Sequence, residues 1–366
     1  MITTILNIII SVFFLGLLIF LHELGHFLFA KKEKVRVEEF GFGYPPRIFG
    51  KKFGETIYSL NWIPFGGFVK LLGEEREAGK EPEPNSFYSK SLWARIKIIV
   101  GGALMFWVIA FVTLTILHVV GVPTAVDDEA RGGFANAQIQ ILQVEKNSPA
   151  ELSGIKAGDI VKNLDIQGEF FEIEKISQLQ DLIKQGAGKE IVFNLSRAGE
   201  DISVSATPRE SSPNGEGPLG VALMRVATIK YPIYEAVWRG AYQTFNLTVA
   251  YLQGLGGILK NIFVGGNMGG LQLMGPVGIS HLNFQMLQLG INYFLNFIVV
   301  VSIALAVCNL LPIPSLDGGK LMFLIIESIK GSPVNPKIEN TITSVMFILL
   351  LGAMVFITYK DILGFF

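Results

Sequence analysis

Phe20-Leu-His-Glu-Leu-Gly-His-Phe-Leu-Phe-Ala30 is the stretch on which the fold of this 366-residue chain depends. His22 and His26 are four residues apart, so on a helix their imidazoles lie on one face, with Glu23 beside them. This pattern is typical of a zinc site in which two histidines bind the metal and the glutamate is the general base. The alternative is a chance match in a packed apolar helix.

The surroundings of this motif are apolar. Between Met1 and Ala30, Glu23 is the only charged side chain, in a segment long enough to span a bilayer. A carboxylate costs about 3 kcal/mol near the middle of a membrane. A divalent metal is the partner that we expect to offset this cost.

A catalytic zinc usually has three protein ligands, so a third must come from elsewhere in the chain. We expect it to be Asp317, within Asn309-Leu-Leu-Pro-Ile-Pro-Ser-Leu-Asp-Gly-Gly319, at the end of the uncharged residues 291–316. Pro312 and Pro314 lack the amide donors that a helix interior needs. The helix should therefore unwind just before the carboxylate.

Composition indicates a membrane protein. Hydrophobic residues make up 50% of the chain, only 17% are charged, and the mean hydropathy is +0.47. Besides the N-terminal segment, uncharged stretches long enough to cross a bilayer occupy residues 98–120, 291–316 and 341–359. We predict an α-helical multi-pass membrane protein with about four transmembrane helices. The net charge of -1 gives no indication of a nucleic-acid partner, and we expect none.

Basic residues set the expected orientation in the lipid bilayer. Four follow the first span between Lys31 and Arg36, and three precede the second span between Lys90 and Lys97. Because basic loops stay on the cytoplasmic side, residues 31–97 should be cytoplasmic. Both termini and the segment between spans two and three should then be extracytoplasmic, and the metal site should lie near the cytoplasmic face.

The first cytoplasmic segment contains a predicted membrane-associated β-hairpin. Residues 55–72 are rich in β-forming side chains, with Pro64, Gly66 and Gly67 at their centre. Such a hairpin can fold back toward the membrane where it is buried in protein or lines a wet cavity. Two roles are open: an edge strand that holds a substrate extended by β-addition, or an ordinary cytosolic hairpin.

Residues 121–228 have the composition of a soluble domain, which we predict to be an inserted domain of mixed α/β type. The run Ser148-Pro-Ala-Glu-Leu-Ser-Gly-Ile-Lys-Ala-Gly-Asp-Ile-Val161 resembles the helix and turn of bacterial PDZ domains. Strands are expected at 190–195 and 201–206. No clear carboxylate-binding loop is visible in the sequence, so the sequence predicts the fold of this domain and not a peptide ligand for it.

Three other segments complete the predicted organisation. The N-terminal membrane half covers residues 1–120, and the C-terminal half covers residues 281–366. Residues 229–280 contain a helix from about Tyr231 to Phe263 and a Gly-rich connection. That helix mixes aromatic and small residues with few charges, which favours a position at the membrane interface over a fifth span.

Transmembrane His-Glu-x-x-His, an Asn-x-x-Pro-x-Pro-x-Leu-Asp-Gly segment and an interposed PDZ-like region together resemble the site-2 protease family, the zinc metalloproteases of regulated intramembrane proteolysis. The chain looks most like the bacterial branch that cleaves membrane-spanning anti-sigma factors. The resemblance implies that His22, His26 and Asp317 bind Zn²⁺. It also implies that Glu23 activates water and that Asn309 helps to position the substrate.

Two positions depart from the family pattern. Relatives commonly carry Ala-Gly-Pro with an Asn three residues on near the start of the second span, where this chain has Gly101-Gly-Ala-Leu-Met-Phe106. After Asp-Gly-Gly, where His or Arg is common, it has Lys320. The second change alters a flank of the metal motif and leaves the ligand intact.

The expected activity is hydrolysis of a peptide bond in or at the edge of the bilayer of a bacterial inner membrane. The substrates would be single-span membrane proteins or peptides that another protease has already trimmed. Two alternatives stay open. One is a scavenger protease of remnant signal peptides, and the other is a non-catalytic membrane PDZ adaptor in which the histidines and the glutamate are structural.

Overall fold

The computed structural model describes residues 2–74, 82–128, 137–197, 199–211, 217–264 and 274–365. The chain divides into two compact units, and each is described by itself. The membrane unit comprises Met1–Leu114, Gly240–Phe284 and Ile298–Phe366. The sheet unit comprises Thr115–Arg239 and Gln285–Phe297.

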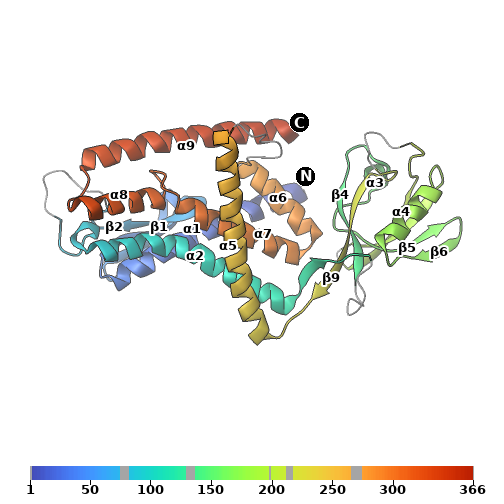
Figure 1. The fold of residues 1–366 in the computed structure, drawn as a ribbon, viewed down its shortest axis with the longest axis horizontal. Coiled ribbons are helices and arrows are strands. Elements are labelled where there is room, and N and C mark those ends of the chain that lie inside the picture. The colour runs from blue at the N-terminus through green and yellow to red at the C-terminus, as the bar shows by residue number, and fades with distance from the viewer. Residues whose placement is uncertain are drawn as a thin grey trace. The chain divides into compact units, whose positions relative to one another are not determined.

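Figure 1 shows the helices and strands. In chain order they are α1 (Ile2–Lys32), β1 (Val37–Phe53), β2 (Thr56–Leu71), the 3-10 turn η1 (Phe87–Ser89), α2 (Leu92–Val120), β3 (Val122–Ala125), β4 (Gln138–Val144), α3 (Pro149–Ser153), β5 (Ile160–Ile166), β6 (Glu169–Glu172), α4 (Ile176–Gln185), β7 (Ile191–Arg197), β8 (Glu200–Ala206), β9 (Val221–Ile229), α5 (Ile233–Val264), α6 (Pro276–Leu289), α7 (Ile291–Asn309), α8 (Asp317–Lys330) and α9 (Pro336–Phe365).

By length and composition, four helices of the described chain could cross a membrane. They are the Phe13–Lys32 part of α1, the whole of α2 and α7, and the Pro336–Leu363 part of α9. This number confirms the prediction of about four apolar spans. The uncharged stretch predicted at residues 98–120 lies within α2, whose helix begins earlier, at Leu92, and includes charged residues in its first turns.

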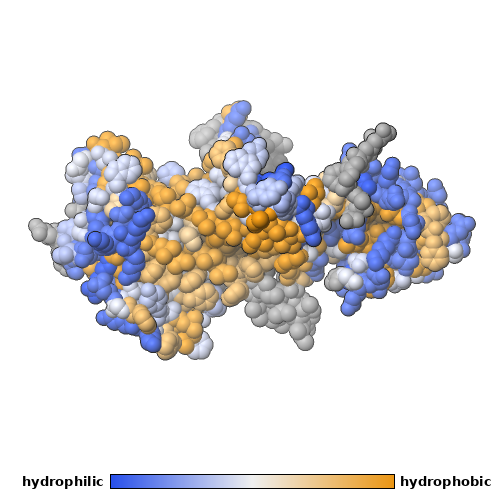
Figure 2. Space-filling view, turned by 90° about the horizontal axis from the view of Figure 1, so that it is seen from below, coloured by the Kyte–Doolittle hydropathy of each residue, from blue (hydrophilic) through white to orange (hydrophobic). Residues whose placement is uncertain are grey.

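α9 shows why the protein needs a lipid surrounding. None of the residues in its apolar window is buried by the rest of the protein, and Phe347, Leu349 and Phe356 are each more than half exposed. Figure 2, which is seen from below, shows a further broad apolar surface, on the face turned away from α9. Exposed apolar surface on this scale is unfavourable in water, at about 25 cal/mol per Å². The acyl chains of a bilayer remove this cost.

The predicted break in the third span is present. α7 ends at Asn309, and α8 begins at Asp317 after seven residues without helical structure, 310–316. Gly318 and Gly319 lie inside α8, where a Cβ atom would be 2.0 Å from the Leu311 carbonyl oxygen and 2.5 Å from that of Ile313, respectively. These glycines therefore provide room for the preceding chain to fold back onto the start of α8.

The hairpin turns at a different place from the one predicted. β1 and β2 run antiparallel and the turn lies at Gly54. Gly66 and Gly67, which were expected at the centre of the hairpin, lie inside β2. A Cβ atom on Gly66 would be 2.7 Å from the side chain of Ile19, and one on Gly67 would be 2.9 Å from the ring of Phe20. The glycines serve the close approach of β2 to α1.

Both strands of the hairpin bend, so together they form four short paired segments. Residues 37–42 pair on one side with 67–71 and on the other with 57–60, and residues 47–53 pair with 56–61. Within the described chain, segment 67–71 thus has a strand partner on one side only. Its other edge can make further backbone hydrogen bonds.

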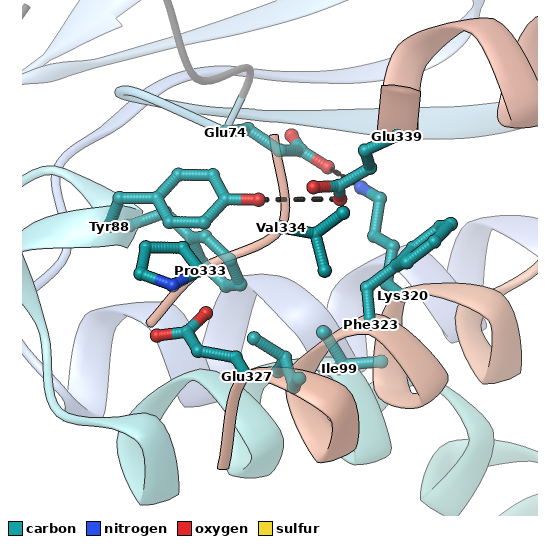
Figure 3. A pocket seen from close by; sticks show the side chains of 11 residues that line it. Glu74, Tyr88, Ile99, Lys320, Phe323, Glu327, Pro333, Val334 and Glu339 are labelled. Atoms are coloured by element: carbon teal, nitrogen blue, oxygen red, sulfur yellow. Dashed lines mark hydrogen bonds and ion pairs between the residues drawn. The ribbon is translucent and has the colours of Figure 1, made fainter. Parts of the chain in front are cut away.

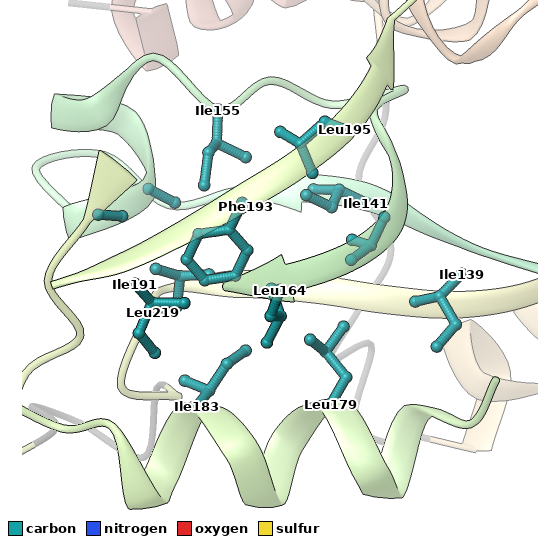
Figure 4. Close-up of a cluster of buried hydrophobic side chains, with 13 residues drawn as sticks. Ile139, Ile141, Ile155, Leu164, Leu179, Ile183, Ile191, Phe193, Leu195 and Leu219 are labelled. Atoms are coloured by element: carbon teal, nitrogen blue, oxygen red, sulfur yellow. The ribbon is translucent and has the colours of Figure 1, made fainter. Parts of the chain in front are cut away.

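The sheet unit contains a seven-stranded antiparallel sheet with strand order β3-β9-β4-β5-β7-β8, and β6 pairs with β5. Ile191, Phe193 and Leu195 alternate along β7 and point into a buried core, which α4 covers with Leu179 and Ile183 (Figure 4). β7 and β8 coincide with the two strands predicted from the sequence. The inserted domain is therefore of mixed α/β type.

The run Ser148–Val161 forms the helix and turn that its sequence predicts. The Ser148 hydroxyl accepts a hydrogen bond from the Glu151 amide at the start of α3, and Gly154 ends the helix with a φ of +87°. A positive φ favours glycine at this position. β5 follows directly after the turn.

Residues Tyr231 to Phe263, predicted as an interfacial helix, correspond to α5. Tyr234, Trp238 and Tyr242 recur at helical spacing and are each more than 60% exposed. α5 is not one of the four helices that meet the length and hydropathy of a span among the described residues. Of the Gly-rich connection predicted between Gly254 and Gly278, residues 265–273 lie outside the described residues. The described part differs from the prediction, because Gly254, Gly256 and Gly257 lie in α5 and Gly278 lies in α6.

Candidate metal centre

Three side chains of the membrane unit converge. α1 carries His22 and His26 one turn apart, and α8 begins with Asp317. The Nε2 atoms of the two imidazoles are 3.1 Å apart. Asp317 Oδ2 lies 3.2 Å from His22 Nε2 and 3.3 Å from His26 Nε2. The structure thus brings together the three residues that were predicted to bind a metal.

These distances fit a zinc ion. Zinc binds nitrogen and oxygen ligands at about 2.0–2.1 Å, so two ligand atoms of a tetrahedral site are about 3.3 Å apart. Asp317 Oδ2 is buried, and no donor in the described chain is aligned to hydrogen-bond to it. Two imidazole nitrogens and one carboxylate oxygen form a donor set typical of catalytic zinc, which leaves a fourth position open.

Neighbouring groups orient the two imidazoles. His26 Nδ1 is 2.9 Å from the Ile98 carbonyl oxygen, which can only accept, so Nδ1 carries the proton and Nε2 keeps its lone pair for a metal. The ring of Phe106 stacks on the ring of His22, with centroids 4.8 Å apart. α2 supplies both contacts, so this helix fixes the ligands carried by α1.

α1 and α2 approach closely at three glycines that the sequence-based prediction did not assign to the site. A Cβ atom on Gly25 would lie 2.2 Å from the carbonyl oxygen of Gly101. One on Gly102 would lie 2.2 Å from His26 Nε2 and 2.7 Å from His22 Cε1. The sequence did contain a signal for this contact: Gly101 and Gly102 form a pair of small residues in an apolar helix, which is typical of close helix packing.

Glu23 lies beside the histidines, and a ligand atom of each of these three residues lies within 4.8 Å of the others. One of its oxygens, Oε2, accepts a hydrogen bond from the backbone amide of Val69 on β2, at 3.1 Å. A cavity of about 210 Å³ lies beside it, lined by Glu23, His26, Asp317 and the end of β2. This volume can hold water and a short piece of extended peptide.

Lys320, where relatives often carry His or Arg, lies at a wall of this cavity and forms an ion pair with Glu74. The same pair lines a smaller cavity of about 20 Å³, shown in Figure 3, where the Tyr88 hydroxyl donates to Glu339. The Lys320 side chain is 46% exposed. Partial desolvation disfavours its charged form, but the Glu74 carboxylate raises its pKa above the usual value. Burial, together with Glu339, raises the pKa of Tyr88 to about 12. Lys320 is therefore charged and Tyr88 neutral at physiological pH.

Asn309, the predicted substrate-positioning residue, lies at the last turn of α7. Its side-chain amide donates to the Leu305 carbonyl oxygen at 3.0 Å. Asn309 is not among the described residues that line the 210 Å³ cavity. The structure therefore places it near the break in the helix and gives it a local contact.

Four apolar helices and a buried His-His-Asp cluster beside a glutamate define a membrane-embedded metallopeptidase. The sequence profile of peptidase family M50 matches residues 10–353, and the chain belongs to this family. It is thus a zinc metalloendopeptidase of the site-2 protease type, and zinc is its cofactor.

Curated relatives cover nearly the whole chain. A candidate zinc metalloprotease of Clostridium perfringens is 33% identical over 94% of this chain and 95% of its own length. The regulator of sigma-W protease RasP of Bacillus subtilis is 28% identical, with 95% and 96% coverage. The zinc metalloprotease RasP of Geobacillus kaustophilus is 26% identical over the full length of both chains.

Proposed function

We propose that the protein is an intramembrane endopeptidase that cleaves the transmembrane segment of single-span membrane proteins, with anti-sigma factors as the substrate class, in regulated intramembrane proteolysis. The observation that carries the proposal is the convergence of His22, His26 and Asp317, with Glu23 beside them. The histidines and Glu23 lie on α1, which is apolar enough to span a bilayer, and Asp317 begins α8, which is separated by seven residues from the end of the apolar α7. The name of the Bacillus subtilis relative, a regulator of sigma-W protease, supports this substrate class.

The residues of the centre have distinct roles in this proposal. His22, His26 and Asp317 hold the zinc ion, which when bound makes water a stronger acid and polarises a carbonyl group. Glu23 accepts the proton of the attacking water and returns it to the leaving amine. Asn309 helps to position the substrate beside these groups.

A transmembrane substrate must unwind before it can be cut, because a helix uses its carbonyl groups in internal hydrogen bonds. The free edge of residues 67–71 is suited to hold such a segment as an added strand. The uncoiled residues 310–316 lie directly before Asp317. An edge strand and a broken helix next to the ligands support cleavage of extended peptide.

For the inserted domain we propose a PDZ fold and a filtering role. A groove of about 180 Å³ between α4 and the start of β9, lined by Ile183, Lys184, Leu219 and Leu223, supports this assignment, although the sequence has no clear carboxylate-binding loop. The distribution of basic residues favours an extracytoplasmic position for this domain and for both termini, with the metal centre near the cytoplasmic face of a bacterial inner membrane. The domain would reject substrates whose outer part has not been trimmed.

Replacement of Glu23 by Gln tests the chemistry. The amide cannot accept the proton of water, so Glu23→Gln should retain zinc and lose at least about a hundredfold in cleavage rate. Zinc analysis and a cleavage assay on a purified single-span substrate measure both effects. Turnover close to that of the parent enzyme would remove Glu23 as the base.

The same assay separates the two proteolytic alternatives. A regulator should cut a trimmed anti-sigma-factor-type segment faster than a remnant signal peptide, whereas a scavenger should prefer the signal peptide. The non-catalytic adaptor has no support, because the chain is a metalloendopeptidase by family.

A further inference from the structure

Glu23 faces β2, on the side of α1 that packs against the hairpin. Gly16 and Phe20 lie on the same side, at helical spacing from Glu23. A Cβ atom on Gly16 would be 3.0 Å from the Gly66 amide nitrogen, and one on Gly67 would be 2.9 Å from the Phe20 ring. Because Gly16 and Gly67 carry no side chain at these points, β2 lies close along α1. The strand therefore passes Glu23 at backbone distance.

The amide of Val69 points to the free edge of the strand. The amide of Leu72, three residues further along, donates to the Arg36 carbonyl oxygen at 2.9 Å and so points toward β1. Alternate amides of a strand point to opposite sides, which directs the Val69 amide away from β1. It meets the carboxylate of Glu23, with its nitrogen 3.1 Å from Oε2.

We infer that the backbone N–H of Val69 is a positioning group for Glu23. This inference rests on the proposed role of Glu23 as the base. A carboxylate on a flexible side chain can take many orientations, but a backbone donor on a strand pressed against α1 cannot rotate away. With Oε2 held by Val69, the carboxylate keeps one orientation and Oε1 remains to accept the proton of water.

The inference gives the hairpin a second task. The edge of residues 67–71 both offers hydrogen-bonding groups to an extended substrate and fixes the base that acts on that substrate. Since the N–H of Val69 is already used by Glu23, an added strand would pair with the groups on either side of it. The scissile bond would then lie next to the carboxylate.

Val69→Pro tests the inference, because proline removes the N–H and is tolerated in edge strands where this group points outward. Val69→Ala is the matched control, since it loses the isopropyl group and keeps the N–H. In zinc-loaded enzyme, kcat of Val69→Pro should fall at least tenfold below that of Val69→Ala, with KM within about threefold. A kcat equal to that of Val69→Ala would overturn the inference, as would a rise confined to KM.

Hydrogen exchange tests the hydrogen bond between the Val69 amide and Glu23 without any substrate. It also tests the inference if Val69→Pro does not fold. In the full-length protein, with or without zinc, the Val69 amide should exchange at least tenfold more slowly than in Glu23→Ala, while the Leu72 amide exchanges equally in both. Equal exchange of Val69 would refute the contact. An active Glu23→Gln variant would instead contradict the proposed function, whatever the exchange rates.

Discussion

Gly102 shapes the metal centre by having no side chain. Both imidazoles occupy the space where a Cβ atom of this residue would be, and the nearest nitrogen would be only 2.2 Å from it. A contact below 3.0 Å forces something to move, and the mobile groups here are His22 and His26. Their positions relative to Asp317 therefore depend on this glycine.

Gly102→Ala should weaken zinc binding by about 10- to 100-fold, the range seen when groups that orient metal ligands are changed. The reason is that the new methyl group displaces His26. Competition with a chelator measures the affinity. Gly352→Ala in α9 is the control, because no atom lies within 4 Å of its added Cβ. Equal affinities for the two variants would show that the site adapts to the methyl group.

The residues of the centre differ in how far the sequence can predict them. His22, His26 and Asp317 were predictable because their side chains carry the chemistry, and the prolines before Asp317 indicate the broken helix. Gly102 acts through space left empty, and Val69 acts through a backbone amide that every non-proline residue has. Nothing in the sequence distinguishes such residues until the neighbouring element is in place.

Among the elements of the membrane unit, α2 and α8 are joined by an ion pair with little exposure. The Arg95 guanidinium donates to both carboxylate oxygens of Glu327, one of the bonds measuring 2.9 Å. The two side chains are 7% and 17% exposed. α2 contacts the two histidines of α1, and α8 carries Asp317. The ion pair between α2 and α8 therefore helps to keep the ligands of the centre together.

Arg95→Met should destabilise the protein by about 3–5 kcal/mol, because it leaves the Glu327 carboxylate poorly hydrated and unpaired. Thermal unfolding in detergent measures the change. Arg239→Met is the matched control: its partner Glu235 is on the same helix and both are well exposed, so the loss should be below about 1 kcal/mol. A similar loss in both variants would contradict a structural role for the Arg95 pair.

The hairpin shows where element prediction fails. Proline and glycine usually mark turns, so Pro64, Gly66 and Gly67 suggested the centre of a hairpin. In the structure they lie within β2, because the strand has to fit against Ile19 and Phe20 of α1. A tertiary contact sets the need for glycine here, and sequence alone does not distinguish it from a turn. The apolar spans, whose length the bilayer determines, were predicted with small errors at their ends.

At the scale of the whole molecule, the sheet unit includes the end of α6 and the beginning of α7, which pack against β4 within that unit. The side chain of Gln140 donates to the Leu289 carbonyl oxygen at 2.9 Å and accepts from the Tyr293 hydroxyl at 2.7 Å. None of the proposed zinc ligands belongs to this unit. The filtering role proposed for the inserted domain therefore requires no catalytic group from it.

Replacing residues 121–228 by a flexible linker should leave zinc content and cleavage of a short substrate intact. If the domain acts as the proposed filter, cleavage of a substrate that keeps a folded outer domain should rise severalfold, because the steric exclusion of bulky substrates is removed. Rates on the two substrates, measured with parent and deletion variant, test this. If the zinc-loaded deletion variant no longer cuts the short substrate, the domain is needed for productive binding and does not act as a filter.

The contact between Gly25 of α1 and Gly101 of α2 also bears on how the enzyme tolerates different membranes. Helices adjust to a thicker or thinner bilayer by tilting. Two helices that touch backbone to backbone, with the His26 ring bonded to the Ile98 carbonyl oxygen, have to tilt as one body. We therefore expect the unburied α9 to adjust to changes in lipid length, and the histidines to keep their geometry as the thickness of the membrane varies.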